Sequence, residues 1–359
     1  MRVMVCGGAG YIGSHTCVVL CERGHEITIV DNFSSSSPDA LQRLEALLGR
    51  GLDAHCLDIR DGAGLDALFS RHRYDAVVHL AALTSAAEAC ERPLAYFDNN
   101  IAGTIALLRS MRAAGVGHLV FSSSAIADAA SALADATDGA AGAAIDERTP
   151  LSCANPYSRT AAVVEQLIGD VCAADPGLRA ISLRYFHPAG AHPSGMLGNL
   201  GHTGGASAAG GGAVGDPLLA ICQTAAGLRE CVQIYGDDWP TADGTCVRDY
   251  LHVMDLARAH ADALDALRDD ALEAEGGYRL LNVGRGSGIS MLQLLRSFEA
   301  ASGRPIPYRV LARRVGDVAE IYADPRRAEA CLGWRAELGV DAICRDTWRL
   351  HAMRGREAA

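Results

Sequence analysis

The chain has 359 residues, of which 49% are hydrophobic and 21% charged, and its formal net charge is −11. This length and composition fit one large α/β domain or two packed ones. The acidic balance argues against a nucleic-acid partner, because a negative surface repels a phosphate backbone. No run of about 18 apolar residues predicts a membrane span.

Twelve cysteines are scattered along the chain, without a CxxC pair or a short His/Cys cluster of zinc-binding spacing. We therefore expect buried thiols and no metal site. The first ten residues, MRVMVCGGAG, are too short and too rich in glycine for a secretory signal. A reducing, cytoplasmic location is the expectation that fits these features.

Strands alternate with helices in the first third of the chain. The apolar runs predict strands at 2–6, 26–30, 74–80 and 118–122, with helices at 11–23, 65–72 and 96–114. Continuous apolar strands alternating with helices favour a parallel sheet covered on both faces. The predicted fold class is α/β, with a doubly wound (Rossmann) parallel sheet.

The pattern changes after about residue 180 to shorter, mixed elements. A helix at 154–173 precedes the change, and the later elements are strands at 232–235 and 278–283 and helices at 255–267, from 291 and at 340–353. Two segments rich in small residues, 128–144 and 198–215, read as inserted loops. We predict a Rossmann domain at 1–179 and a smaller mixed α/β domain at 180–359, some of whose segments return to the sheet.

Three glycines follow the first predicted strand and open the first predicted helix. Gly7, Gly10 and Gly13 are spaced as G-x-x-G-x-x-G in VMVCGGAGYIG. The first glycine permits a tight turn, the second lets the backbone approach a pyrophosphate, and the third lets helix and strand pack closely. The motif predicts a dinucleotide site, with the phosphates at the helix N-terminus.

An acidic residue stands where such a site needs one. Asp31 ends the second strand, 18 residues beyond Gly13. A carboxylate there accepts hydrogen bonds from ribose hydroxyls and repels a 2′-phosphate, which favours NAD over NADP. Asp58 and Ile59 follow the third strand, a position that suits contacts with adenine, and Asn99 lies in DNNIAGT.

A serine and a tyrosine are the candidate catalytic pair. Ser122, Ser123 and Ser124 end the fifth strand, at the edge of the sheet where doubly wound folds bind ligands. Tyr157 begins a predicted helix in NPYSRTAAVVEQ. A tyrosinate beside a nicotinamide can take a hydroxyl proton while a hydride leaves the same carbon. We therefore expect Ser124 and Tyr157 to converge.

Several longer segments carry a family resemblance over nearly the whole chain. They are GGAGYIGSHT, YFDNNIAGT, FSSSA, RYFHPAGAHPSG, IYGDDWPTADGTCVRDYLHVMDLA and RRVGD. With these segments the chain resembles the extended short-chain dehydrogenase/reductases, and within them the UDP-glucose 4-epimerase family. The resemblance implies bound NAD, transient oxidation of a UDP-hexose at C4, interconversion of UDP-glucose and UDP-galactose, and a homodimer.

The resemblance also implies a set of site residues. Those expected to contact NAD are Gly7, Gly10, Tyr11, Ile12, Gly13, Asp31, Asn32, Asp58, Ile59, Ala81, Ala82, Asn99, Ser122, Tyr157 and Phe186. Those expected to contact the UDP-sugar are Ser124, Tyr157, His187, Gln233, Ile234, Tyr235, Arg248, Arg314 and Asp317. The two arginines suit a diphosphate, because guanidinium groups bind such anions in a bidentate manner.

One departure from the family pattern falls beside the candidate catalytic tyrosine. The family motif is Tyr-x-x-x-Lys, whereas this chain has Ala161 four residues after Tyr157. Residues i and i+4 share a helix face, so the lysine would stand next to the phenol and lower its pKa from about 10. Arg159 is only two residues away and points off that face. We therefore expect weak turnover.

Further departures leave other functions open. Thr84, His187, Asp216 and Ile321 stand where the family pattern has lysine, asparagine, asparagine and tyrosine. A non-catalytic NAD or nucleotide-sugar binding protein is one alternative. A sugar-nucleotide dehydratase is another, with Asp128 as the nearest candidate for the extra acid/base group that it needs.

Overall fold

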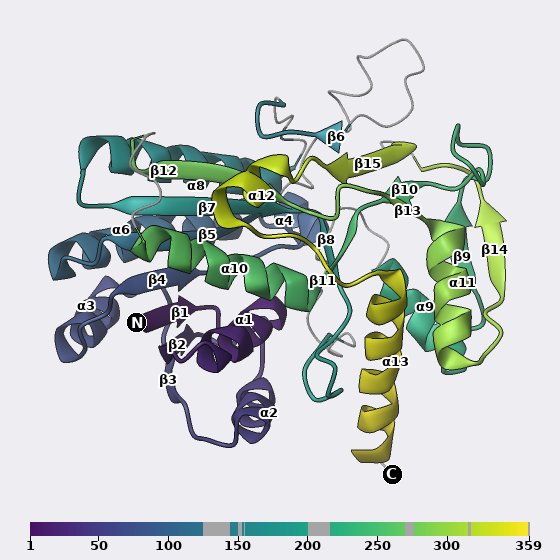
Figure 1. Cartoon of the computed structure of the whole chain (residues 1–359), viewed down its shortest axis with the longest axis horizontal. Coiled ribbons are helices and arrows are strands. Elements are labelled where there is room, and N and C mark those ends of the chain that lie inside the picture. Colours follow the sequence, from purple (N-terminus) through teal and green to yellow (C-terminus); the bar gives the residue numbers. More distant parts are fainter. Residues whose placement is uncertain are drawn as a thin grey trace.

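The computed structural model describes residues 1–124, 144–149, 153, 155–199, 216–269, 276–314 and 317–357. The segment predicted as a loop at 128–144 lies outside these residues except for Ala144. The one predicted at 198–215 lies outside them except for Gly198 and Asn199. Figure 1 shows the described elements as a layered body with a smaller lobe at one end, where α9, α11 and α13 gather.

A seven-stranded parallel sheet forms the centre of the larger part. Its order is β12-β7-β5-β4-β1-β2-β3, and every neighbouring pair in it is parallel. The strands are β1 (Arg2–Cys6), β2 (Glu26–Asp31), β3 (Asp53–Cys56), β4 (Ala76–His79), β5 (His118–Ser124), β7 (Arg179–Tyr185) and β12 (Tyr278–Val283). The order reverses between β1 and β4, and at such a switch point a doubly wound sheet binds ligands.

Alternate residues of a strand enter opposite faces of this sheet. In β1, Val3 and Val5 join the core on one face, and Met4 and Cys6 join the core on the other. The first face packs under α1 (Tyr11–Glu22), α2 (Pro38–Leu48), α10 (Val253–Arg268) and α12 (Arg326–Leu332). The second packs under α3 (Gly62–Arg71), α6 (Gly103–Ala114) and α8 (Pro156–Ala174). Both faces are therefore covered, which explains the continuous apolar strands.

The remaining elements build the smaller lobe and the strands that join it to the sheet. The helices are α9 (Pro217–Ala225), α11 (Met291–Ser302) and α13 (Val340–Glu357), which share one apolar core with β9 (Val232–Tyr235). The other strands are β6 (Ala144–Ile145), β8 (His187–Ala189), β10 (Val247–Arg248), β11 (Tyr250–His252), β13 (Ile289–Ser290), β14 (Tyr308–Leu311) and β15 (Glu320–Ala323). Thus β7 and β12, both distant in sequence from β1, return to the central sheet.

The predicted doubly wound sheet is confirmed, and the differences from prediction are local. The helix predicted at 96–114 consists of α5 (Pro93–Tyr96), a π-helical turn η1 (Phe97–Ala102) and α6. The strand predicted at 74–80 is shorter, and α2 and the short α4 (Ala86–Glu91) were not predicted. A π-helical turn inside a helix often marks a functional site, and η1 contains Asn99.

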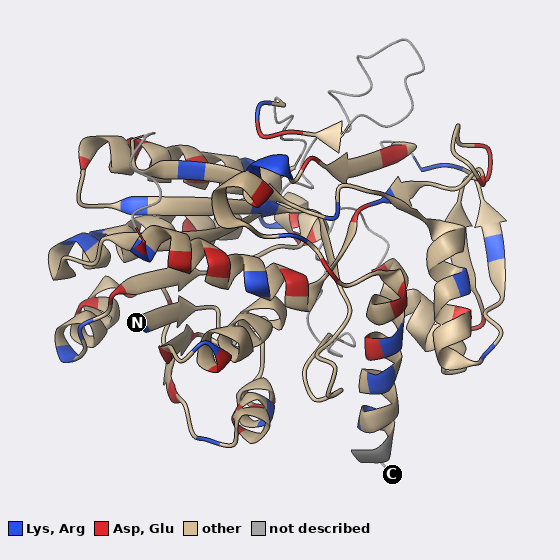
Figure 2. Ribbon diagram, in the orientation of Figure 1, with Lys and Arg blue, Asp and Glu red and all other residues tan. Residues whose placement is uncertain are grey.

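Charge is spread over the outside of the molecule. Figure 2 shows acidic and basic residues interspersed along the helices, with both signs on α10 and α13. No helix in the described part of the chain has the length and apolar character needed to cross a membrane.

Candidate active site

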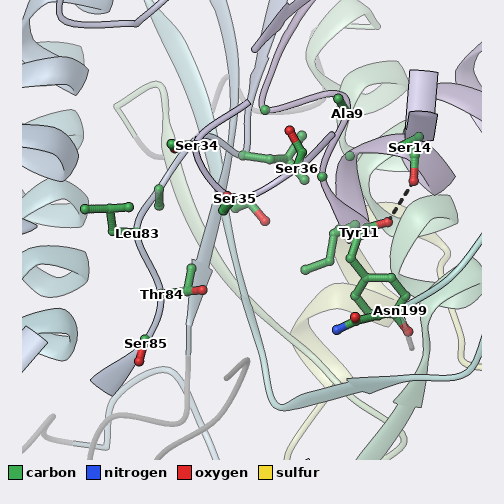
Figure 3. A pocket seen from close by; sticks show the side chains of 18 of the residues that line it. Ala9, Tyr11, Ser14, Ser34, Ser35, Ser36, Leu83, Thr84, Ser85 and Asn199 are labelled. Atoms are coloured by element: carbon green, nitrogen blue, oxygen red, sulfur yellow. Dashed lines mark hydrogen bonds between the residues drawn. The ribbon is translucent and has the colours of Figure 1, made fainter. Parts of the chain in front are cut away.

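A cavity of about 600 Å³ opens at the carboxyl ends of β1 and β4. Its walls come from the glycine turn after β1, the loop after β2, the loop after β4, the end of β5 and the start of α8. Figure 3 shows Ser34–Ser36 from the loop after β2, Leu83–Ser85 from the loop after β4, and Ala9 and Tyr11 from the glycine turn and the start of α1 around this space. The cavity has the volume of a typical cofactor or small-ligand site.

The backbone of the glycine turn packs so closely that a Cβ on Gly7 or Gly13 would collide with neighbouring backbone atoms. Gly7 has φ +81°, and a Cβ on it would lie 2.7 Å from the Ala81 nitrogen. A Cβ on Gly13 would lie 2.0 Å from the Gly7 carbonyl oxygen. Gly10 precedes α1 and supplies no side-chain cap. The first amides of a helix lack internal partners, so those of α1 suit a pyrophosphate at the positive end of the helix dipole.

Asp31 ties the loop after β2 to the glycine turn. Its carboxylate accepts hydrogen bonds from the Ala9 amide (3.0 Å), the Phe33 amide (2.9 Å) and the Ser36 hydroxyl (2.8 Å). Asn32 lines the cavity and donates to Asp58 (2.9 Å). Arg60 also binds Asp58 (2.8 Å) and lines the same end of the cavity. These residues fit the adenosine half of a dinucleotide, with a fixed carboxylate beside the glycine turn.

Ser124 and Tyr157 meet in the cavity wall, as the sequence predicts. Tyr157 is the second residue of α8, and Ser124 is the last residue of β5. Burial raises the pKa of the Tyr157 phenol, and the hydrogen bond with Ser124 lowers it in part. The Ser122 hydroxyl donates to the Tyr185 phenol (3.1 Å), and both residues line the cavity. The Tyr157 phenol and the Ser124 hydroxyl therefore line the same space.

Ala161 lies one turn along α8 from Tyr157. It borders a second cavity of about 30 Å³, whose walls include Tyr157, Ser124, Thr160 and His79. Arg159 is turned elsewhere, because its guanidinium donates to the Cys153 carbonyl (3.1 Å). All 32 basic residues of the chain are arginine, so no lysine from any segment can supply an ammonium group here.

Of the residues expected at the UDP-sugar, Gln233, Tyr235, Arg314 and Asp317 contact one another at the smaller lobe. The Arg314 guanidinium stacks over the Tyr235 ring, 4.4 Å from its centroid, and donates to Asp317 (2.9 Å). Tyr235 in turn donates to Gln233 (2.8 Å), and both belong to β9. The flanking Ile234 is buried in the core of the lobe, so its side chain points away from this surface.

Arg248 lies in β10, and its positive charge acts on His187. Burial first, and then the positive charge of Arg248, lower the pKa of His187 to about 3. The imidazole is therefore neutral near neutral pH. His187 packs against the Tyr250 ring, with 5.6 Å between the centroids.

Asp216 has a local structural role. It caps α9 by accepting a hydrogen bond from the Leu218 amide (2.9 Å), and burial raises the pKa of its carboxyl.

The structure separates the predicted cofactor residues into three groups. The group that lines the large cavity is Gly7, Gly10, Tyr11, Ile12, Gly13, Asn32, Ala82, Asn99, Ser122 and Tyr157. Ala81 borders the small cavity. Four residues lie outside the lining of both cavities: Asp31, Asp58, Ile59 and Phe186. The two aspartates bind loop residues. Ile59 packs under α6, and Phe186 is fully buried beside Ile145 and Ile321.

Several lining residues were not predicted from the sequence. They include Arg43, Arg60, Glu88, Arg92, Tyr96, Tyr185, Asn199 and Arg354. Tyr185 carried a signal, because it ends β7 directly before Phe186 in the RYF segment. Arg354 lies in the last helix and carried none.

The comparisons with known proteins agree with this geometry. The model of the NAD dependent epimerase/dehydratase family matches residues 3–284. The chain belongs to that family, whose cofactor is NAD, and the glycine turn lines the cavity that suits it.

Relatives that match over nearly their full length identify a narrower family. The chain is 42% identical to UDP-glucose 4-epimerase of Mus musculus, over 97% of this chain and 96% of that protein. It is 41% identical to UDP-glucose 4-epimerase of Erwinia amylovora, over 97% of each. The chain is thus a member of the UDP-glucose 4-epimerase family, as its motifs predicted.

Solved structures lead to the same family. UDP-glucose-4-epimerase of Stenotrophomonas maltophila, crystallised with NAD and formylated UDP-arabinopyranose, matches with a TM-score of 0.89 at 42% identity, over 100% of both chains. The Bifidobacterium longum enzyme, in complex with NAD+ and UDP, matches with a TM-score of 0.84 at 36% identity, over 99% of both chains.

Proposed function

We propose that this protein interconverts UDP-glucose and UDP-galactose, and that it does so slowly. The observation that carries the proposal is the meeting of Tyr157 and Ser124 in the wall of the cavity that the glycine turn opens. Membership of the UDP-glucose 4-epimerase family supplies the substrate class. Bound NAD supplies the chemistry of taking a hydride from the sugar's C4 and returning it to the same carbon.

The chain's own groups move the proton and hold the sugar. Tyr157 as tyrosinate takes the proton of the 4-hydroxyl as the hydride leaves C4, so that a 4-keto sugar forms, and it gives the proton back when the hydride returns and the hydroxyl re-forms on the other face. Ser124 donates a hydrogen bond to the same oxygen. The two redox changes cancel, so the reaction consumes no oxidant or reductant.

Arg248 and Arg314 are the proposed diphosphate ligands. Both are guanidinium groups of the smaller lobe, and Arg314 is held in place by the Tyr235 ring and by Asp317. His187, neutral beside Arg248, can donate to a sugar or phosphate oxygen without adding charge. We also propose that residues 1–179 bind NAD and that residues 180–359 mainly bind the UDP-sugar. The site residues predicted above are the proposed contacts of these two ligands.

A homodimer and a cytoplasmic location complete the proposal. Leu94 on α5, Phe97 on η1 and Val163 on α8 are exposed large hydrophobic residues, and these three elements contact one another. An exposed apolar surface of this kind is typical of a subunit interface. Sedimentation at several concentrations tests it: a monomer throughout would contradict the dimer.

Released cofactor and product together test the function. We expect the denatured protein to release NAD, and the native protein to convert UDP-galactose slowly to UDP-glucose. NAD release without conversion of UDP-galactose under any condition would favour the alternative of a non-catalytic binding protein, to which Ala161 also points.

A further inference from the structure

The small cavity between Tyr157 and Ala161 has no explanation in the proposed reaction. Its volume is about 30 Å³, and one water-sized group needs roughly 10–15 Å³. Ser122, Ser124, Tyr157 and Tyr185 form walls of both cavities. A group in the small cavity would therefore lie against the phenol that faces the cofactor site.

The described walls of this cavity carry no positive charge. The one titratable base among them is His79, which is 1% exposed, and burial lowers its pKa to about 4. Its tautomer follows from a neighbour. The Thr104 hydroxyl donates its one hydrogen to the Asn100 carbonyl (2.6 Å). It therefore accepts a hydrogen bond from His79 Nε2 (2.9 Å), which is the ring nitrogen that carries the hydrogen. The His79 Nδ1 is thus a neutral acceptor, and it has no partner among the described residues.

Asn100 and Thr160, two further polar residues of the walls, have hydrogen-bond partners already. The Asn100 amide donates to the Leu83 carbonyl (3.0 Å) and to Thr160 (2.9 Å), and the Thr160 hydroxyl donates to the Tyr157 carbonyl (2.7 Å). The phenol itself is buried with a raised pKa. A tyrosinate here needs a counter-charge, because burial penalises its charged form, and the N-terminus of α8 provides only a partial one.

We propose that this cavity binds a small ammonium ion, NH4⁺ or a primary alkylammonium, which acts as the counter-ion of the Tyr157 tyrosinate. NH4⁺ has the size of a water molecule, both kinds of ion donate hydrogen bonds, and each brings the positive charge that the described walls of the cavity lack. The inference rests on the proposed function for its effect on turnover, but its binding and its effect on the phenol are separate properties.

Added amines test the inference by rate. Near neutral pH and at constant ionic strength, methylammonium chloride should raise kcat for UDP-galactose conversion saturably, by about tenfold or more, since one unit of pKa is a factor of ten in tyrosinate. Tetramethylammonium is too large for the cavity and should have no effect. An equal response to tetramethylammonium, or none to methylammonium in an enzyme that turns over, would overturn the inference.

Three variants place the effect in this cavity. Ala161→Leu should fill it and abolish the response, and Ala161→Lys should supply the charge covalently and no longer respond. Ala162→Leu, one residue along the same helix and outside the walls of both cavities, should leave the response unchanged. NAD content, measured after denaturation, identifies any variant that has lost its cofactor. Retention of the response in Ala161→Leu would overturn the site.

The ionisation of the phenol gives a readout that needs no turnover. The ultraviolet difference spectrum of the protein against Tyr157→Phe should titrate at a pH lower by about one unit in methylammonium than in tetramethylammonium. A shift without epimerisation under any condition would sustain the ammonium site and overturn the proposed function. Epimerisation without a shift or a rate response would overturn the site alone, and the absence of all three would overturn both.

Discussion

Replacing Ala161 with lysine should restore most of the turnover that the chain lacks. Positions 157 and 161 share one face of α8, with Cβ atoms about 5–6 Å apart. At an effective dielectric constant of about 20, opposite unit charges separated by that distance interact by about 3 kcal/mol. That energy lowers the Tyr157 pKa by about two units and raises kcat near neutral pH about a hundredfold.

The absence of lysine makes this variant unusually easy to observe. The introduced residue would be the one lysine in the chain, so after reductive methylation with labelled formaldehyde its NMR signal stands beside that of the N-terminal amine alone. The assay is kcat for UDP-galactose conversion against pH, whose profile should move about two units toward acid. Ala161→Met is the control, because it adds a similar length of side chain without charge.

One combination of results would refute the electrostatic reasoning. It is an Ala161→Lys protein that folds, releases NAD on denaturation and shows a single ordered lysine signal, yet has the kcat and pH profile of the parent chain. A gain of equal size in Ala161→Met would refute it as well, because packing and not charge would then explain the change.

Three substitutions and one pH profile test the same geometry. Tyr157→Phe should retain NAD and lose at least about a thousandfold in kcat, because it removes the proton acceptor; retained turnover would exclude Tyr157 from that role. Ser124→Ala should lose about tenfold to a hundredfold in kcat with an unchanged KM, and a change in KM alone would assign it to binding. In the parent chain kcat should rise about tenfold per pH unit through neutrality, because burial holds the Tyr157 pKa above its usual value; a flat profile would contradict this. Gly13→Ala places a Cβ 2.0 Å from the Gly7 oxygen and should cost about 2–3 kcal/mol, measured by denaturant unfolding, together with NAD content; a stable, NAD-loaded variant would be unexpected.

The sheet and the glycine turn were predictable because they depend on local patterns. Apolar runs such as 2–6 are long enough to define buried strands, and Gly7 is required by a φ that side chains rarely adopt. The helix α2 was missed although Leu41, Leu44 and Leu48 repeat at helical spacing and Gly49 ends it with φ +65°. A run of serines precedes the helix, and only one residue of the helix is fully buried.

The site was predictable at the sheet and less so elsewhere. Ser124 and Tyr157 could be joined from sequence because a strand end and a helix start meet at one edge of a doubly wound sheet. Phe186 could not be placed, because a strand ends beside it and its ring turns into a separate apolar cluster. Arg354 reaches the cavity from the last helix, through tertiary packing that no local pattern records.

The fate of the hydrogen on C4 shows directly whether a hydride leaves this carbon and returns to it. The measurement is conversion of UDP-galactose deuterated at C4 by the purified protein, followed by mass and NMR analysis of the product. We expect slow formation of UDP-glucose that keeps the deuterium on C4, because the hydride returns to the carbon it left. Two results would contradict this expectation. One is UDP-glucose whose deuterium has exchanged with solvent, and the other is NAD-loaded protein that forms no UDP-glucose, with or without added amine.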